Sequence, residues 1–261
     1  MAYIGTNVFL GSALIGQTFL GDKQIEYTPF DNTPTPYVTS GSVLILDASS
    51  SFSYPGSGNT WYDLSGYGNN ATLTNMAANW TGTGGGYFDF PNTYADYMIV
   101  TQSGSLNNAF VGDFTIDMWI TADQFVSGQW MAPFGKLDNS SFTFIINKDT
   151  ANPPKGSVRW YISGAEYNYT NRLSLVAGAW FNLQFVRTGT SIVMYQSTSN
   201  MGSVTVSGDL SNTNNLQLGR GWNSALYPMD GKMGWFAIYN RALSSTELAQ
   251  NYNLIRTRYG V

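Results

Sequence analysis

The sequence predicts an all-β fold, a two-sheet antiparallel sandwich. Only 11% of the 261 residues are charged, and Asn, Ser, Thr and Gly, which favour turns over helices, supply most of the polarity. Several segments alternate apolar and polar side chains, most strictly at 114–121. Aromatic residues make up 15% of the chain, which argues against disorder, and sandwiches of this length occur as single units.

Charge and composition exclude several classes of function. The net charge is −4, and the 12 Lys and Arg residues form no cluster, so we expect no binding of nucleic acid or of an anionic membrane. The chain has no Cys and no His, which removes disulfides, thiolate sites and the commonest general base and zinc ligand. No basic residue precedes Lys23, and Gly and Ser interrupt the apolar runs. We therefore predict neither a signal peptide nor a transmembrane segment, and no membrane insertion.

Residues 1–27 form a segment of their own. The stretches 4–11 and 15–21 are near repeats, each typical of a short strand closed by Gly, so hairpins are expected. Hairpins of this size are not stable alone in water and need a partner surface. We predict a docking arm at 1–27, followed by a Pro-rich, semi-rigid linker at 28–41. The alternative is that these strands join the sandwich.

The sandwich is predicted to occupy residues 42–261. Its first strand is the apolar run 43–46, which Asp47 ends. In the segment 114–121, the set that contains Phe114 faces the space between the sheets, and the set that contains Asp117 and Trp119 faces the other way. At the end of the chain, Ser244 and Glu247 form a capping-box pattern that opens one short helix, on which Leu248, Tyr252 and Ile255 share a face. Further strands are expected at 87–90, 96–100, 141–147, 158–163, 180–187, 192–196 and 216–219.

Two stretches resemble a known family. Residues 42–70 contain a strand that ends in Asp-Ala, a Tyr-Pro-Gly turn, a Trp-x-Asp-Leu-Ser-Gly loop and Gly-Asn-Asn. Residues 238–260 contain Ile-Tyr-Asn-Arg-Ala-Leu-Ser-x-x-Glu-Leu, Asn-Tyr-Asn and Arg-x-Arg-Tyr-Gly. Both are similar to laminin G-like, concanavalin A-like domains in the form common in bacteriophage structural proteins. The resemblance covers residues 42–261 and implies a jelly-roll sandwich.

The resemblance also implies a place of action. Short N-terminal arms attach phage structural proteins to the particle, so residues 1–27 are expected to contact other virion proteins, with the chain on the virion surface. Unpaired strands add to neighbouring sheet edges, which favours a homo-oligomer. Fibres of this kind are often trimers, but no repeat in the chain fixes the number.

Enzymes of this superfamily cleave glycans with paired carboxylates. The chain has only three Glu residues, none near another in sequence. Asp113 and Asp117 share strand parity but lie about 13 Å apart on an extended strand, whereas a retaining pair needs about 5 Å. Without His or Cys, a Ser nucleophile lacks its usual base. We predict that the protein is not an enzyme and has no catalytic residue; an inverting hydrolase that uses Asp117 is the alternative.

A single calcium ion at the sandwich rim, held by Asp or Asn oxygens, is a further implication of the resemblance. Asx residues beside Gly are also ordinary turn formers, and Gly234-Trp235 stands where many relatives carry an acid. We therefore predict no cofactor, with calcium as the alternative. The candidate ligands are Asp63, Asn69, Asn70, Asp138 and Asp230.

Carbohydrate binding requires aromatic faces and amide or carboxylate hydrogen bonds, and no catalytic residue. The candidate ligand-binding residues are Asp117, Trp119, Tyr167, Tyr169, Trp222 and Tyr227. Each aromatic taken alone is more typical of sandwich packing than of sugar binding, and only the group makes a binding surface plausible. We predict a tail fibre, baseplate or capsid decoration component that displays the sandwich for adhesion or host-surface glycan binding. The alternatives are a purely structural virion component without glycan binding and a glycan hydrolase.

Overall fold

The computed structural model describes residues 8–10, 13–15, 18–20, 23–25, 36–125, 129–136, 142–148, 155–221 and 227–261. The chain divides into two compact units, Met1–Pro36 and Tyr37–Val261.

The first unit contains two short antiparallel hairpins. β1 (Val8–Leu10) pairs with β2 (Ala13–Ile15), and β3 (Thr18–Leu20) pairs with β4 (Lys23–Ile25). The hairpins that the near repeats predict are therefore present, with one strand in each repeat. The role of this segment as a virion-docking arm stays a prediction.

The second unit is the predicted all-β sandwich of two antiparallel sheets. Sheet I has the order β18-β17-β16-β11-β20-β9-β8, with β5 also paired to β20, and sheet II has the order β15-β14-β13-β12-β19-β10-β7-β6. The strands of sheet I are β5 (Ser42–Asp47), β8 (Trp80–Thr81), β9 (Tyr87–Pro91), β11 (Phe114–Ile120), β16 (Phe181–Thr188), β17 (Ser191–Gln196), β18 (Ser199–Thr205) and β20 (Asp230–Tyr239). Those of sheet II are β6 (Thr60–Trp61), β7 (Ala71–Thr74), β10 (Tyr97–Val100), β12 (Trp130–Lys136), β13 (Phe142–Asn147), β14 (Val158–Ile162), β15 (Ala165–Asn168) and β19 (Leu216–Leu218).

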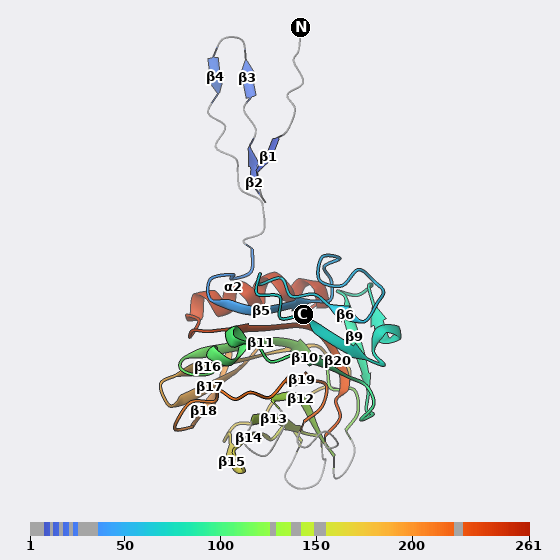
Figure 1. Ribbon diagram of the computed structural model, residues 1–261, viewed down its shortest axis with the longest axis vertical. Helices are drawn as coiled ribbons and strands as arrows, with labels where there is room; N and C mark the ends of the chain where they lie inside the picture. The colour runs from blue at the N-terminus through green and yellow to red at the C-terminus, as the bar shows by residue number, and fades with distance from the viewer. Residues whose placement is uncertain are drawn as a thin grey trace. The chain divides into compact units, whose positions relative to one another are not determined.

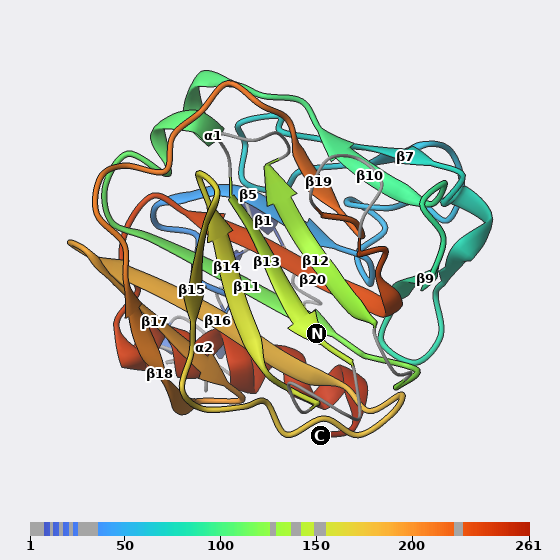
Figure 2. The same cartoon turned by 90° about the horizontal axis from the view of Figure 1, so that it is seen from below.

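Three layers of this unit are visible in Figure 1: helix α2 (Ser245–Arg256), then sheet I, then sheet II. Figure 2 shows β12, β13, β14 and β15 side by side in front of the strands of sheet I. The smaller helical segments are α1 (Gly104–Asn108) and the 3-10 turns η1 (Ala77–Asn79) and η2 (Thr257–Tyr259).

The main core fills the space between the sheets. At its centre Trp160 is fully buried, with its ring 5.1–5.7 Å from the ring centroids of Phe134, Phe142, Phe144 and Phe185. Phe114, Ile116, Met118 and Ile120 of β11 also belong to this core. The inward parity predicted for 114–121 is therefore confirmed.

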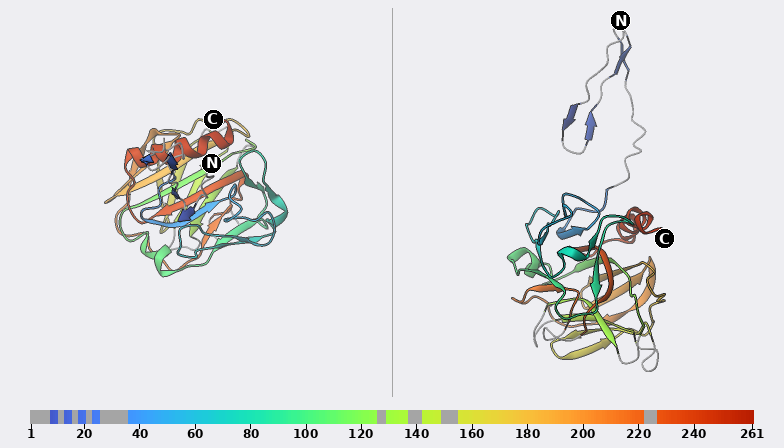
Figure 3. Two further views of the ribbon diagram at one scale, coloured as in Figure 1. Left: turned by 90° about the horizontal axis from the view of Figure 1, so that it is seen from above. Right: turned by 90° about the vertical axis from the view of Figure 1, so that its right-hand side faces the viewer.

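A second core lies between α2 and the outer side of sheet I. Figure 3 shows α2, in red, at the surface of this unit in two further views. The predicted capping box is present: the Ser244 hydroxyl accepts from Glu247 N at 3.3 Å, and Glu247 Oε2 accepts from Ser244 N at 2.8 Å. Leu248 and Ile255 are buried against the sheet and Tyr252 packs beside them, as predicted.

Some elements were not predicted. β12 contains Pro133 and Gly135, which are unusual in a central strand, and its pairing with β13 is irregular between Met131 and Phe134. β18 is polar and contains Gly202, so its composition is that of a loop. Both strands form because their neighbours provide hydrogen-bonding edges, which composition alone does not reveal.

The second unit begins at Tyr37, before the predicted start of the sandwich at residue 42. The Tyr37 ring packs edge-on against Trp235 with centroids 5.0 Å apart. Val38 N donates to Asn251 Oδ1 at 2.8 Å, and Val38 O accepts from the Tyr239 hydroxyl at 3.0 Å. The last residues assigned to the linker thus form part of the sandwich. None of the helices in the described chain has the length and hydropathy that a membrane span requires.

Candidate functional site

Asp117 lies at the centre of a buried polar network beneath α2. Its carboxylate accepts hydrogen bonds from the side-chain amides of Asn182 at 2.7 Å, Asn251 at 3.1 Å and Gln184 at 3.4 Å. Burial raises the pKa of Asp117 to about 6, and the three amides oppose that rise. The expectation that this carboxylate faces a ligand is corrected, because α2 covers its side of the sheet.

Trp119 is covered by the same helix as Asp117. Its ring is fully buried and stacks on Tyr252 of α2, with centroids 5.4 Å apart. The predicted direction of the side chain away from the main core is correct, but a helix occupies the space where a sugar was expected. Trp119 therefore presents no face to solvent.

Of the other predicted aromatics, the described members are all partly or fully buried. Tyr169 is 6% exposed, and its hydroxyl accepts from Trp160 Nε1 at 3.1 Å inside the main core. Tyr167, on the edge strand β15, is half-buried against that core. Tyr227 is half-buried with a φ of +59°, and Trp222 lies outside the described residues.

The Asp63 loop is built from its own hydrogen bonds. Asp63 Oδ1 accepts from the backbone N–H groups of Ile45 and Ser65 at 2.9 and 2.8 Å, and Oδ2 accepts from Ser65 Oγ and Asn69 N at 2.7 and 2.9 Å. Asn70 Oδ1 accepts from Asp63 N at 2.9 Å. The Asn69 amide donates to Val43 O at 2.7 Å. Each side chain binds loop or strand backbone, which supports the interpretation of these residues as turn formers rather than the calcium alternative.

The remaining candidate calcium ligands are Asp230 and Asp138. Asp230 is buried and pairs with the fully buried Lys148 at 2.5 Å. Asp138 lies outside the described residues. At Gly234 a Cβ would overlap the Tyr259 hydroxyl, so packing against the chain end explains why this position carries no acid. In the part of the chain that the structure describes, no three acidic side chains gather as metal ligands do.

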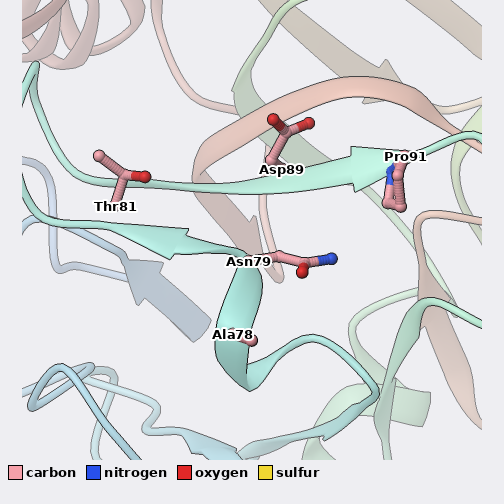
Figure 4. Close-up of a pocket in the computed structure, with 5 residues that line it drawn as sticks. All are labelled: Ala78, Asn79, Thr81, Asp89 and Pro91. Atoms are coloured by element: carbon pink, nitrogen blue, oxygen red, sulfur yellow. The ribbon is translucent and has the colours of Figure 1, made fainter.

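An open pocket of about 280 Å³ lies on the surface at the β8–β9 edge of sheet I. Strand alternation creates it: Phe88 and Phe90 point into the main core, so Asp89 between them points outward. Figure 4 shows the lining side chains on two neighbouring segments of chain. They are Ala78, Asn79, Thr81, Asp89 and Pro91.

The polar atoms of this pocket are largely unused by the protein. In the described chain, the Asp89 carboxylate and the Thr81 hydroxyl make no hydrogen bond, and the Asn79 amide has only a 3.7 Å contact with Met76 Sδ. Partial burial of the carboxyl raises the pKa of Asp89, and nearby Lys232 opposes this rise. Lys232 lies opposite Asp89 in the strand register. The pocket therefore offers a carboxylate, an amide and a hydroxyl to a ligand.

Lys232 is held by a different acid. Its Nζ binds Asp123 Oδ2 at 2.8 Å, and Asp123 Oδ1 accepts from Thr121 Oγ1 at 2.6 Å. Asp89 is thus left without an ion-pair partner within hydrogen-bond distance among the described residues. It is also the one carboxylate that lines the described pocket, whereas glycoside hydrolysis needs two acting together.

An aromatic ring stands beside Asp89. Tyr87 precedes it by two residues on the same side of β9, half-exposed, and contacts Trp180 edge-on with centroids 5.8 Å apart. Sequence reasoning predicted this strand but assigned no role to Tyr87 or Asp89. The available signal was an acid between two core phenylalanines, which alternation turns toward the outer side of the sheet.

Comparison with protein families identifies the chain. The family described as "Concanavalin A-like lectin/glucanases superfamily" matches residues 92–249, more than half of the sequence. This chain belongs to the concanavalin A-like lectin/glucanase superfamily. The predicted superfamily and the predicted jelly-roll sandwich are thereby confirmed, whereas residues 42–70 lie outside the match. No curated protein matches the chain.

Solved structures share the fold of this superfamily member. The binding domain of Paraclostridial Mosquitocidal Protein 1 is 16% identical with a TM-score of 0.64, and the match covers 83% of this chain and 52% of that one. The binding domain of Botulinum neurotoxin DC, solved with rat synaptotagmin II, is 15% identical with a TM-score of 0.64, covering 84% and 52%. A structure of botulinum neurotoxin type C, whose cell entry depends on interaction with two ganglioside molecules, is 14% identical with a TM-score of 0.64, covering 84% and 52%. The chain spans about half the length of these proteins.

Proposed function

We propose that the protein is a bacteriophage virion component whose sandwich binds saccharides on the host surface. Membership of a lectin and glucanase superfamily supports the binding class. The resemblance of residues 42–70 and 238–260 to phage structural proteins supports the virion assignment. Residues 1–27 are the docking arm of this proposal, and the protein acts without turnover.

The observation that carries the proposal is the pocket of Asp89. A carboxylate accepts hydrogen bonds from adjacent sugar hydroxyls, and hydrogen bonds to a charged group are stronger than neutral ones. Asn79 both donates and accepts, and Thr81 adds a hydroxyl. Tyr87, the register partner of Thr81, adds an aromatic ring next to the pocket without lining it. The set matches a ligand that carries many hydroxyls on an apolar ring.

Replacement of Asp89 by Asn is expected to lower the affinity for a bound host saccharide by about tenfold or more. The change removes charge-assisted hydrogen bonds of roughly 1.5–3 kcal/mol and keeps the shape of the side chain. Affinity is measured by calorimetry with a saccharide selected on a glycan array. Asp209→Asn is the control, because Asp209 is exposed and bonds only to Ser211 in its own turn. Equal affinities of Asp89→Asn and wild type would contradict the role of this pocket.

Deletion of residues 1–27 tests the other half of the proposal. The shortened chain is expected to bind the same saccharides and to be absent from purified particles, because the hairpins supply the attachment surface. Immunoblots of particles made with either chain measure retention. Retention of the shortened chain would show that attachment lies elsewhere. Incubation of the full chain with the bound saccharide also measures turnover. Any cleavage would favour a glycan hydrolase over a protein that only binds saccharides.

A further inference from the structure

A groove of about 460 Å³ lies at another end of sheet I, between the loop that joins β15 to β16 and the β17–β18 hairpin. Its lining combines apolar and polar side chains. Its lining includes Arg172, Val176, Trp180, Phe181, Ser199 and Met201.

The loop on one side of the groove is fixed to the sandwich. Leu173 and Leu175 are buried, so the residues between and beside them point outward. Gln196 at the end of β17 accepts from Ser174 N and donates to Ser174 O, both at 2.9 Å. Gly178 N donates to Ala122 O at 2.9 Å. The groove is therefore formed before any ligand binds, which reduces the ordering cost of binding.

Trp180 provides a rigid aromatic surface in this groove. Its ring stacks on Tyr259 with centroids 3.9 Å apart and planes inclined by 22°, and it contacts Tyr87 edge-on. The side chain is only half-buried, and it lines the groove in addition to these two contacts. An indole held in this way binds the C–H face of a sugar ring at little cost in side-chain entropy.

Arg172 is the one arginine of the described chain that makes no hydrogen bond to protein. The others bind carboxylates or carbonyl and amide oxygens, namely Arg159, Arg187, Arg220, Arg241, Arg256 and Arg258. Arg172 is exposed at the groove, with its guanidinium available to an anion. A planar guanidinium binds a carboxylate through two parallel hydrogen bonds.

We propose that this groove binds a carboxylate-bearing saccharide. Trp180 stacks on the sugar ring, Arg172 binds its carboxylate, and Ser174 and Ser199 offer hydroxyl partners. The groove and the pocket of Asp89 have different lining residues, and they adjoin where Trp180 contacts Tyr87. It gives the protein a preference for acidic surface polysaccharides, although the net charge of the chain is negative.

The test is calorimetry of the full chain with trigalacturonate and with its methyl ester, which has the same sugar rings but methylated, uncharged carboxyl groups. Wild type is expected to bind the acid about tenfold or more tightly than the ester at low salt, and less selectively at high salt. Arg172→Gln is expected to bring the ratio close to one without weakening the ester. Trp180→Ala should weaken both ligands. Arg256→Gln, a change at an exposed arginine elsewhere, should retain the wild-type ratio.

Val176→Asp gives a second test that leaves the stacked rings intact. Val176 is 65% exposed in the groove, so a carboxylate there should repel the acid and spare the ester, whatever the effect of Trp180→Ala on folding. Equal binding of acid and ester by wild type, an unchanged ratio in Arg172→Gln, or no binding of either ligand would overturn the proposal. Equally tight binding of oligoglutamate would assign the groove to acidic peptides instead. Asp89→Asn should retain the ratio, which separates this result from the fate of the other pocket.

Discussion

Replacement of Asn251 by Ala is expected to lower the free energy of unfolding by about 3 kcal/mol, because it removes three buried hydrogen bonds at once. The Asn251 amide donates to Asp117 Oδ2 at 3.1 Å and to the Tyr239 hydroxyl at 3.0 Å, and its oxygen accepts from Val38 N at 2.8 Å. The variant leaves a buried backbone donor without a partner and a buried carboxylate with one donor fewer. Urea denaturation followed by tryptophan fluorescence measures the change.

Asn253→Ala is the matched control, since Asn253 lies on the same helix with its side chain exposed. The same substitution there should change the free energy of unfolding by less than about 0.5 kcal/mol, in the stabilising direction, because Ala has the higher helix propensity. If both variants unfold at the same urea concentration, the network does not hold α2 on the sheet. In that case the apolar contacts of Leu248 and Ile255 alone retain the helix.

The contact between Asn251 and Asp117 could not be predicted from the sequence. The capping box and the apolar spacing of Leu248, Tyr252 and Ile255 predict α2 and the side that faces the sandwich. They do not show that an amide on that side meets Asp117, because the two residues are 134 positions apart. For the same reason Trp119 was assigned correctly to one side of its strand and wrongly to solvent. Alternation fixes the side of a strand, and only the tertiary fold decides what covers it.

Local turn chemistry was easier to predict. Asp63, Asn69 and Asn70 bind groups close to them in sequence or in the neighbouring strand, which is the usual behaviour of Asx residues in loops. The pocket and the groove have the opposite character. Asp89 is one polar residue on the strand next to the edge of sheet I, and Arg172 is one cation in a loop. Both are ordinary features of solvated surfaces. Their value as binding groups depends on their lack of protein partners, which a sequence does not encode locally.

Ionisation of Asp117 makes the stability of this network dependent on pH. Burial raises its pKa to about 6 from the ordinary 3.8, so between these values the folded state holds a proton that the unfolded state has released. Stability therefore rises as pH falls from 7 towards 4 and is reduced as pH rises through 6. Glu247 affects stability in a different pH range. Arg241 lowers its pKa to about 2, so its contribution is complete above about 4.5 and is lost only in stronger acid.

Asp117→Asn is expected to remove this pH dependence. Between pH 7 and pH 4.5 the free energy of unfolding of wild type should increase by about 2 kcal/mol relative to the variant, which is neutral throughout. Subtraction of the two curves of unfolding free energy against pH removes the contribution of Asp89, whose pKa is also raised and which both proteins contain. Parallel curves would show that the amides of Asn182, Gln184 and Asn251 offset the burial of the charge completely.

The same variant distinguishes two interpretations of Asp117. If this carboxylate took part in glycan cleavage, Asp117→Asn would abolish turnover while the protein remained folded. Since Asp117 lies beneath α2 with no exposed surface, we expect saccharide binding by Asp117→Asn to match wild type at pH 7 at temperatures where both are folded. Calorimetry and circular dichroism on the same samples measure both properties. A folded variant that loses binding would mean that α2 transmits the state of the network to the surface.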